Sequence, residues 1–241
     1  MELSLFSVSY AGLWGQARLD LEAFIAKASA LGYSAVMLMG KRPHLAPLDI
    51  DEARLATIAA CLERHQVRCA AVAGYTDFSA PRAAEVPFGE MQVDYVRALC
   101  RFATALDARL VRVFTAYEDP RTSPTAEWNT VVAALRECAD VAADFGVILA
   151  VQNHHDVAVQ SDALLELLND VERSNVKLAF DAWSPALRGE SLYDAAKRMA
   201  PYTAITTNAD YIRLPRYRYR PELVNYERLL SYERSSFVTF P

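Results

Sequence analysis

The chain has 241 residues, and 53% of them are hydrophobic, which is enough for a substantial core and excludes a disordered protein. Its formal charge is −5 and its pI is near 5.5, whereas nucleic-acid-binding proteins normally show a basic face. No apolar run approaches the roughly 18 residues of a membrane span, and the N-terminus has no secretion-signal pattern. We therefore expect a cytoplasmic protein that binds neither nucleic acid nor a membrane.

Short apolar strands alternate with amphipathic helices in the first half of the chain. A strand is predicted at residues 3–8, a helix at 21–31 with Gly32 as its C-cap, a strand at 35–39, a helix at 55–62 and a strand at 67–73. A longer loop then leads to a helix at 96–106 and a strand at 110–114. The four cysteines (Cys61, Cys69, Cys100 and Cys138) have no C-x-x-C spacing, so we expect buried, reduced thiols.

The alternation continues through the second half. Ser123 and Pro124 mark the start of a helix that runs to Ala142, and a strand at 147–151, a helix at 163–168 and a strand at 176–180 follow. A short helix at 192–199 precedes a seventh strand at 203–207. Beyond it come a polar loop, a helical stretch at 221–232 and an apolar segment at 237–240.

This order of elements predicts an α/β fold, a (βα)8 TIM-type barrel that is incomplete at its eighth βα unit. Neither dinucleotide-binding nor P-loop glycine motifs occur, and no linker interrupts the pattern, so we expect a single domain over residues 1–241. A closed barrel requires the last strand to pair with the first. Either residues 237–240 pair with residues 3–8, or the barrel is open and a partner covers the gap.

Polar side chains follow the predicted strands, where barrels of this kind carry their chemistry. The apolar strand at 147–151 ends in Gln152, Asn153, His154, His155 and Asp156, and the strand at 176–180 ends in Asp181. We predict proton transfer by His154, Glu118 and Asp181. The predicted substrate-binding residues are Lys41, Arg42, His44, Tyr75, Asn153, His155, Trp183, Arg216 and Arg218. Such a set suits a polyhydroxylated or keto substrate, which is bound through many hydrogen bonds and an aromatic wall.

Some of these residues have simpler interpretations. Asp181 is also a favoured residue for capping the turn that follows, and Lys41 with Arg42 also fits a solvated loop. The arginines and tyrosines of residues 213–221 suit the binding of a phosphate or carboxylate, the stacking of bases, or an exposed lid or subunit contact in a homo-oligomer.

With these residues assembled, the chain resembles the xylose-isomerase-like TIM barrel superfamily of sugar phosphate isomerases and epimerases, which includes, more distantly, abasic-site endonucleases. The resemblance covers the chain to about Tyr211. Leu149-Ala150-Val151-Gln152-Asn153-His154-His155 resembles the family strand that ends in Glu-Asn-His, and Leu178-Ala179-Phe180-Asp181 resembles the strand that ends in Phe-Asp. Lys41-Arg42-Pro43-His44 looks like a substrate-loop motif of some members.

In metal-dependent members, the resemblance implies, Glu, Asp, His and a second Glu hold one divalent ion, which stabilises an enediolate. Here the first glutamate corresponds to Gln152, the aspartate to Asp181 and the histidine to a position near Thr207, and the second glutamate has no counterpart. Gln152, Asp181 and Asp210 are the remaining candidate ligands for Mn²⁺, Mg²⁺ or Zn²⁺, with His154 and His155 as substitutes.

Two functions are therefore compatible with the sequence. The first is an isomerase or epimerase that moves a proton next to a carbonyl of a carbohydrate, with His154 or Glu118 as base in place of the missing glutamate, and Lys41 or Arg42 stabilising the enediolate. The second is a non-catalytic or truncated family member that binds a carbohydrate or a protein partner.

Overall fold

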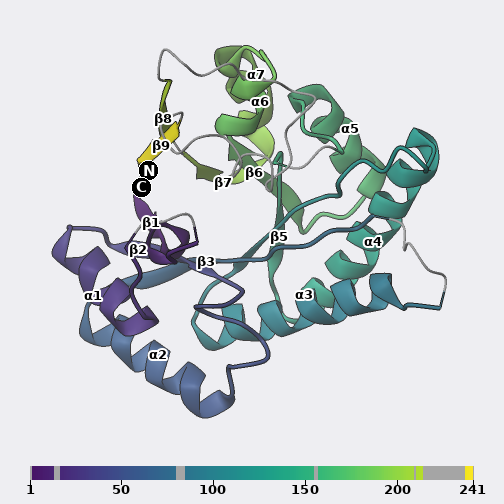
Figure 1. Ribbon diagram of the computed structural model, residues 1–241. Helices are drawn as coiled ribbons and strands as arrows, with labels where there is room; N and C mark the ends of the chain where they lie inside the picture. The colour runs from purple at the N-terminus through teal and green to yellow at the C-terminus, as the bar shows by residue number, and fades with distance from the viewer. Residues whose placement is uncertain are drawn as a thin grey trace.

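Seven parallel strands form one curled sheet in the computed structural model, which describes residues 2–13, 17–79, 85–154, 157–208, 210–213 and 237–240. The strands are hydrogen-bonded in chain order, and the helices lie on the outside of the curl (Figure 1). The seven strands are β1 (Ser4–Phe6), β2 (Ala35–Met39), β3 (Arg68–Ala73), β4 (Leu110–Val113), β5 (Ile148–Gln152), β6 (Val176–Asp181) and β7 (Thr203–Thr207). The predicted TIM-type barrel is confirmed, and within the described residues its sheet ends at the seventh strand.

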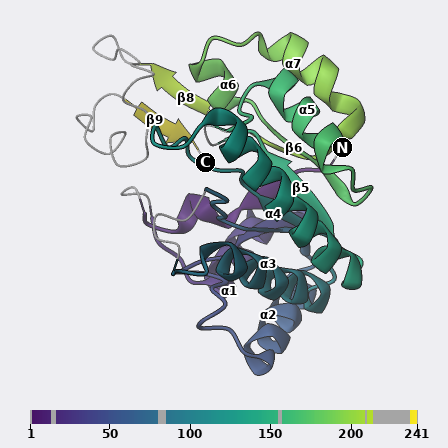
Figure 2. The same ribbon diagram turned by 90° about the vertical axis from the view of Figure 1, so that its right-hand side faces the viewer.

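The helices that cover the sheet start and end where the sequence predicts capping. Ser123 accepts a hydrogen bond from the Ala126 backbone, and Pro124 occupies the first turn of the fourth helix, as expected. Gly32 follows the first helix with φ +83°, a left-handed conformation that glycine adopts without strain. The helices are α1 (Leu21–Ala30), α2 (Glu52–Arg64), α3 (Phe88–Ala105), α4 (Pro124–Asp144), α5 (Ser161–Val171), α6 (Trp183–Leu187) and α7 (Leu192–Met199). In Figure 2, α3, α4 and α5 lie side by side over the sheet.

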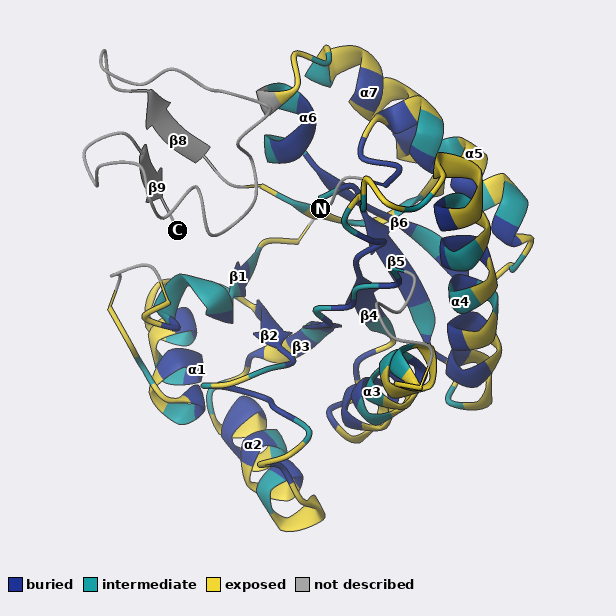
Figure 3. Ribbon diagram, turned by 45° about the vertical axis from the view of Figure 1, so that its right-hand side comes forward, coloured by how far each residue is buried: buried dark blue, intermediate teal, exposed yellow. Residues whose placement is uncertain are grey.

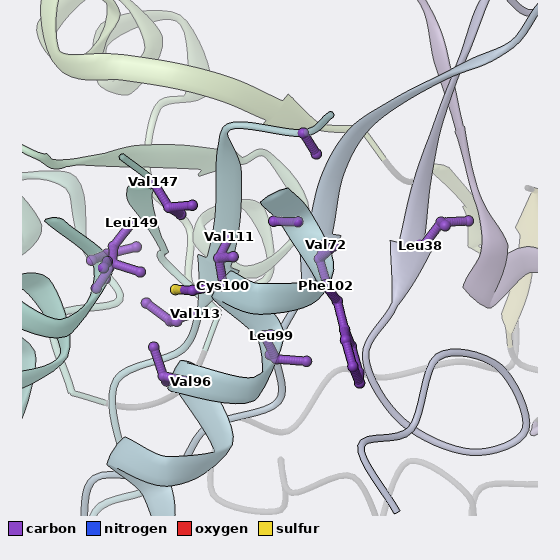
Figure 4. Packing of buried hydrophobic residues seen from close by; sticks show 14 of the residues in the cluster. Leu38, Val72, Val96, Leu99, Cys100, Phe102, Val111, Val113, Val147 and Leu149 are labelled. Atoms are coloured by element: carbon purple, nitrogen blue, oxygen red, sulfur yellow. The ribbon is translucent and has the colours of Figure 1, made fainter. Parts of the chain in front are cut away.

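The main core lies between the outer face of the sheet and these helices. Val72, Val111 and Leu149 point outward from successive strands and are completely buried. In Figure 4 Val72 lies against Phe102 of α3, and Val111 lies near Cys100 of the same helix. Complete burial of an aliphatic side chain stabilises the fold by about 1.5–3 kcal/mol. Because side chains alternate along a strand, this outer packing directs the intervening residues into the barrel.

The opposite face of the sheet lines the barrel interior. A small apolar cluster of Met37, Ala71 and Ala73 lies there, with Leu110 and Ile205 packed against it. Figure 3 shows that the strands in the middle of the sheet are buried, whereas on β7 the outward residues Ala204 and Thr206 are exposed. The sheet is therefore well covered from β2 to β6 and less so at β7.

The N-terminal end of the sheet differs from the expectation, and the C-terminal end follows the open one of the two alternatives. The strand predicted at residues 3–8 ends at Phe6, and Ser7–Tyr10 form a 3₁₀ helix, because the Ser7 hydroxyl accepts a hydrogen bond from the Met39 backbone at 2.8 Å and turns the chain inward. Residues 237–240 form a strand, β9 (Phe237–Phe240), but it pairs antiparallel with β8 (Asp210–Arg213) and not with β1. In the described part of the chain, β1 and β7 are thus the edges of the main sheet. The helix predicted at 221–232 lies outside the described residues.

Candidate active site

A histidine–aspartate pair joins the ends of β5 and β6. His154 follows β5, and its Nδ1 lies 3.0 Å from Oδ2 of Asp181, the last residue of β6. Asn153 holds the two strand ends in register, because its side chain donates to the Asp181 carbonyl and accepts from the Asp181 amide, at 3.0 and 2.7 Å. Both side chains of the pair are almost completely buried. The structure thus brings Asn153, His154 and Asp181 together at the adjacent ends of two strands.

The Asp181 carboxylate is surrounded by hydrogen-bond donors. Its Oδ2 accepts from Gln152 Nε2 at 3.0 Å and from the Ser184 hydroxyl at 3.3 Å, besides His154, and its Oδ1 accepts from the Trp183 amide at 2.9 Å. Burial alone would raise the pKa of Asp181, but the hydrogen bond and positive charge of His154, with the Trp183 and Gln152 donors, outweigh it and hold the pKa below its usual value. Asp181 is therefore ionised at neutral pH.

The contact with Asp181 sets the tautomer of the His154 ring. A hydrogen bond from Nδ1 to a carboxylate requires the proton on Nδ1, so in the neutral ring Nε2 is the nitrogen with the free lone pair. The imidazole is also held between two aromatic rings, with its centroid 4.9 Å from that of Phe114 and 5.8 Å from that of Trp183. This combination is typical of a positioned general base, whose imidazolium form the neighbouring carboxylate stabilises.

Two positively charged side chains, Arg112 and Lys41, continue the series of ring contacts beyond Phe114, away from His154. The Cζ atom of Arg112, which points into the barrel from β4, is 4.0 Å from the centroid of Phe114 and 4.8 Å from that of Tyr75. Lys41 Nζ lies 3.8 Å from the centroid of Tyr75. Such distances are within the range of cation–π attraction. We call these six residues the cation–aromatic row: Lys41, Tyr75, Arg112, Phe114, His154 and Trp183.

Two glycines let the strand ends approach closely enough to form this row. A Cβ on Gly74 would lie 2.9 Å from the Arg112 carbonyl oxygen, and one on Gly40 would lie 2.9 Å from the Ala73 carbonyl oxygen. Tyr95 of α3 then ties the two loops together, since its hydroxyl donates to the Gly40 carbonyl at 2.8 Å and accepts from the Tyr75 amide at 3.1 Å. Lys41 and Tyr75 therefore start from fixed backbone positions.

Three buried polar atoms around the pair have no hydrogen-bond partner in the described part of the chain. They are Gln152 Oε1, Trp183 Nε1 and Thr207 Oγ1, from the ends of β5, β6 and β7. Buried polar groups are normally hydrogen-bonded, because an unsatisfied one costs about 1–3 kcal/mol. One acceptor, one donor and one hydroxyl at adjacent strand ends are therefore left without a partner among the described residues.

The same residues do not fit the divalent ion that the resemblance implies. Within the described ranges, no group of three or more His, Cys, Asp or Glu side chains could hold a metal. Oδ2 of Asp181 already accepts from three donors, and Gln152 turns its amide nitrogen toward that oxygen. Among the described side chains, a cation at this place would face an N–H group and only one carboxylate, whereas hard divalent cations are bound by several oxygen ligands.

Several predicted residues lie away from this row. The Arg42 guanidinium is exposed and pairs with Asp49 at 2.5 Å, and Glu118 is also exposed. His44 is buried, with Nδ1 3.1 Å from the Ser7 hydroxyl and Nε2 3.0 Å from the Leu19 carbonyl oxygen, so both ring nitrogens bond within the fold. His155, Arg216 and Arg218 lie outside the described residues. Of Asp210 only the backbone, in β8, is described.

Two residues of the site were not among the predicted ones: Arg112 and Phe114. Ser184 is one of the polar residues that follow the predicted strand at 176–180, but no role was predicted for it. Arg112 carries a signal in the sequence, since it is the only charged residue of Leu110–Val113 and lies at the inward position of a strand whose neighbours Val111 and Val113 face outward. The contact of Phe114 with His154 depends on the loop after β4, and the contact of Ser184 with Asp181 depends on α6. The hydrophobic periodicity of the sequence does not predict either one.

Comparison with known proteins agrees with this architecture. The family described as "Xylose isomerase-like TIM barrel" matches residues 25–215. Similar solved structures include the probable 3-DHS dehydratase AsbF from Bacillus anthracis, at 16% identity and TM-score 0.78, covering 99% of this chain and 83% of that one.

Two epimerase structures share the fold as well. D-psicose 3-epimerase from Clostridium cellulolyticum H10 has 17% identity and TM-score 0.70, covering 86% of this chain and 72% of that one. The 3-keto-D-glucoside 4-epimerase from E. coli has 11% identity and TM-score 0.69, covering 86% and 78%. Comparison with curated protein sequences finds no match. In the described part, no helix combines the length and apolarity needed to cross a bilayer.

Proposed function

The chain belongs to the xylose isomerase-like TIM barrel family, and on this premise we propose that it is a carbohydrate isomerase or epimerase that transfers a proton at a carbon next to a carbonyl. The observation that carries the proposal is the buried His154–Asp181 pair, with its 3.0 Å contact, at the C-terminal ends of β5 and β6. In barrels of this architecture the chemistry takes place at that end of the sheet.

In the proposed reaction His154 Nε2 removes the proton and returns it. The negative charge of Asp181 stabilises the imidazolium that forms, and the rings of Phe114 and Trp183 keep the imidazole oriented. As the proton leaves, negative charge develops on the carbonyl oxygen of the substrate. Lys41 and Arg112 supply positive charge on the same side of the barrel and stabilise this enediolate oxygen.

The unsatisfied polar atoms support a carbohydrate as the substrate. Gln152 Oε1 would accept from one hydroxyl, Trp183 Nε1 would donate to another, and Thr207 Oγ1 would do either. A hydrogen-bonded substrate of this kind is discriminated strongly from analogues that lack a hydroxyl, because the buried partner then stays unsatisfied.

The test is exchange of substrate hydrogen with deuterium from D₂O, followed by NMR on a panel of ketoses and aldoses, with and without a chelator. We expect exchange that the chelator does not change, and a loss of about 10²–10⁴-fold in His154→Gln, the usual size of a general-base contribution. His65→Gln, the same substitution at the end of α2, is the matched control and should leave exchange intact. Exchange that requires added Mn²⁺, or that survives in His154→Gln, would contradict the proposed mechanism.

A second function, binding without catalysis, is favoured by one observation: Gln152 stands where the resemblance implies a glutamate. Such a protein would bind a carbohydrate through the same unsatisfied atoms without exchanging its hydrogens. Saturable binding of a sugar by calorimetry, together with no exchange in wild-type protein at any pH between 6 and 9, would establish this function in place of the first.

A further inference from the structure

Thr76, in the loop after β3, holds Phe114, the residue after β4, by both of its backbone groups. The Thr76 hydroxyl donates to the Phe114 carbonyl oxygen at 2.7 Å and accepts from the Phe114 amide at 2.8 Å. The two strand ends are also joined by a backbone hydrogen bond from the Gly74 amide to the Arg112 carbonyl oxygen, at 2.7 Å. Beyond this bond the hydroxyl gives each backbone group of Phe114 a partner, so it continues the pairing of the two strand ends past the sheet.

Both residues of this contact are buried. Thr76 is 1% exposed and Phe114 is 4% exposed, so solvent has almost no access to the hydroxyl or to the two groups that it binds. Buried amide and carbonyl groups are normally hydrogen-bonded, because solvent does not replace a partner that is lost. A side chain buried to this extent does not contact a substrate directly. Any effect of Thr76 on a reaction therefore passes through the residue that it holds.

The ring of Phe114 is one of the two walls of the His154 imidazole. The centroids of these two rings are 4.9 Å apart and their planes are inclined by 25°. The second wall is Trp183, at 5.8 Å and 30°, which is fixed by the hydrogen bond from its amide to Asp181. Each wall thus has its own attachment to the fold, and that of Phe114 is the Thr76 hydroxyl.

We propose that Thr76 is a positioning residue for the proton transfer: its hydroxyl fixes the Phe114 ring, and this ring fixes the orientation of the His154 imidazole. The catalytic part of this role rests on the proposed function, whereas the alignment of the imidazole does not require catalysis. A reacting group that is displaced by about 1 Å can lose about 10²-fold in rate, so the attachment of a wall residue is sufficient to affect the reaction.

The deuterium-exchange assay, with the sugar that wild-type protein exchanges fastest, tests the catalytic part. Thr76→Val keeps the shape of the side chain without the hydroxyl and should lower the rate at saturating substrate by about 10- to 100-fold. KM should stay nearly unchanged, because Thr76 is buried away from the substrate. Thr76→Ser keeps the hydroxyl and should restore most of the rate. The matched control is Thr203→Val, which removes a hydroxyl bonded to the Met199 carbonyl oxygen at 2.9 Å, at the opposite end of the barrel, and should leave the rate unchanged.

NMR of histidine-labelled protein measures the alignment of the imidazole without substrate. Aromatic rings stacked on an imidazole shift its proton resonances upfield, so the His154 signals report its contact with Phe114, and His154→Gln identifies them. Thr76→Val should move these signals toward the positions of an unstacked ring, and Thr76→Ser should not. The signals of His65, at the end of α2, should stay in place in every variant.

Phe114→Leu tests whether Thr76 acts through the aromatic ring. This variant keeps the backbone groups that bind Thr76 but removes the ring. It should therefore reproduce the slower exchange and the shifted His154 signals, even if Thr76→Val is too unstable to measure. The double variant should lose no more rate than Phe114→Leu alone, because a positioning residue has no further effect once the residue that it positions is gone.

The outcomes separate this role from the proposed function. An unchanged rate or unmoved His154 signals in Thr76→Val or in Phe114→Leu would overturn the positioning role, and exchange by wild-type protein would still support the function. An equal loss in Thr203→Val, or additive losses in the double variant, would also overturn the positioning role, because loss of stability alone would account for the effect. His154 signals that move in Thr76→Val and return in Thr76→Ser, in a wild-type protein without exchange, would support the alignment and contradict the catalysis.

Discussion

Replacing Gln152 by glutamate puts a second carboxylate against Asp181 and tests the electrostatic argument for this site directly. In the wild-type chain Gln152 Nε2 donates to Asp181 Oδ2 at 3.0 Å, and both side chains are almost fully buried, at 4% and 2% exposure. Gln152→Glu keeps the size of the side chain, removes the donor and adds a like charge. Gln152→Met also removes the donor but adds no charge, so it is the matched control.

The expected penalty follows from the distance between the two groups. Two like charges about 4 Å apart repel by about 4 kcal/mol at an effective dielectric constant of 20. The lost hydrogen bond contributes about 1 kcal/mol more, and this part is shared with Gln152→Met. Repulsion raises the pKa of the new carboxyl above that of the unfolded chain. The destabilisation of the folded Gln152→Glu variant by this repulsion is therefore absent below the unfolded-state pKa of about 4. It grows as the pH rises and is constant above the folded-state pKa of the new carboxyl.

Urea unfolding of the three proteins at pH 5 and pH 8 measures this effect. Gln152→Glu should lose several kcal/mol relative to Gln152→Met at pH 8 and less at pH 5, and the control should show a small loss that does not depend on pH. The glutamate also completes a pair of carboxylates, so Mn²⁺ should raise the midpoint of Gln152→Glu and leave that of wild-type protein unchanged. Equal stability of Gln152→Glu and Gln152→Met at pH 8 would refute the reasoning.

Three further predictions concern the support of the site. Gly74→Ala should lower the free energy of unfolding by about 1–3 kcal/mol, because the added Cβ would lie 2.9 Å from the Arg112 carbonyl oxygen and from Leu99. The control is Gly89→Ala in the first turn of α3, where the Cβ meets open space and the change should be neutral or stabilising. Equal thermal midpoints of the two variants would contradict this reasoning. Asp181→Asn should have a lower free energy of unfolding than wild-type protein at pH 7. In acid unfolding this difference should decrease as the pH falls below about 4 toward the lowered pKa of Asp181. A difference that does not change with pH would exclude an ionised Asp181. All four cysteines are buried, and burial raises the pKa of Cys69, Cys100 and Cys138 to about 12, so Ellman's reagent at pH 8 should react only after denaturation; a fast native phase would show an accessible thiol.

The strands could be predicted from the sequence because each is a short apolar segment between two amphipathic helices. The runs at 35–39 and 203–207 match β2 and β7 residue for residue. β3, β4 and β6 differ from the prediction by one residue at one end, and β5 differs by one residue at both ends. In a barrel, such a segment normally forms a parallel strand that is buried on both faces. The first strand was predicted too long because the hydroxyl of Ser7 bonds to Met39, a contact between segments that no local pattern contains.

The site was predicted in part for a similar reason. Asn153 and His154 follow β5, and Asp181 is the last residue of β6, so the parallel alignment of the two strands brings them together. Arg42 and His44 also follow a strand, but the loop after β2 turns Arg42 toward Asp49 and seats His44 against Ser7 and Leu19. Position after a strand thus places a residue at the right end of the barrel, and the loop conformation decides whether its side chain faces the interior.

The open edge of the sheet does not weaken the proposed site, because the site is carried by interior strands. β4, β5 and β6 each have hydrogen-bonded neighbours on both sides, and the cation–aromatic row joins them through Arg112, His154 and Trp183. Only Thr207 belongs to an edge strand of the described sheet, and the proposed function gives it a hydrogen bond to the substrate and no part in proton transfer. Sites on rigid, doubly paired strands keep their geometry better than sites on loops. Changes at β7 should therefore alter substrate affinity before they alter the alignment of His154 with Asp181.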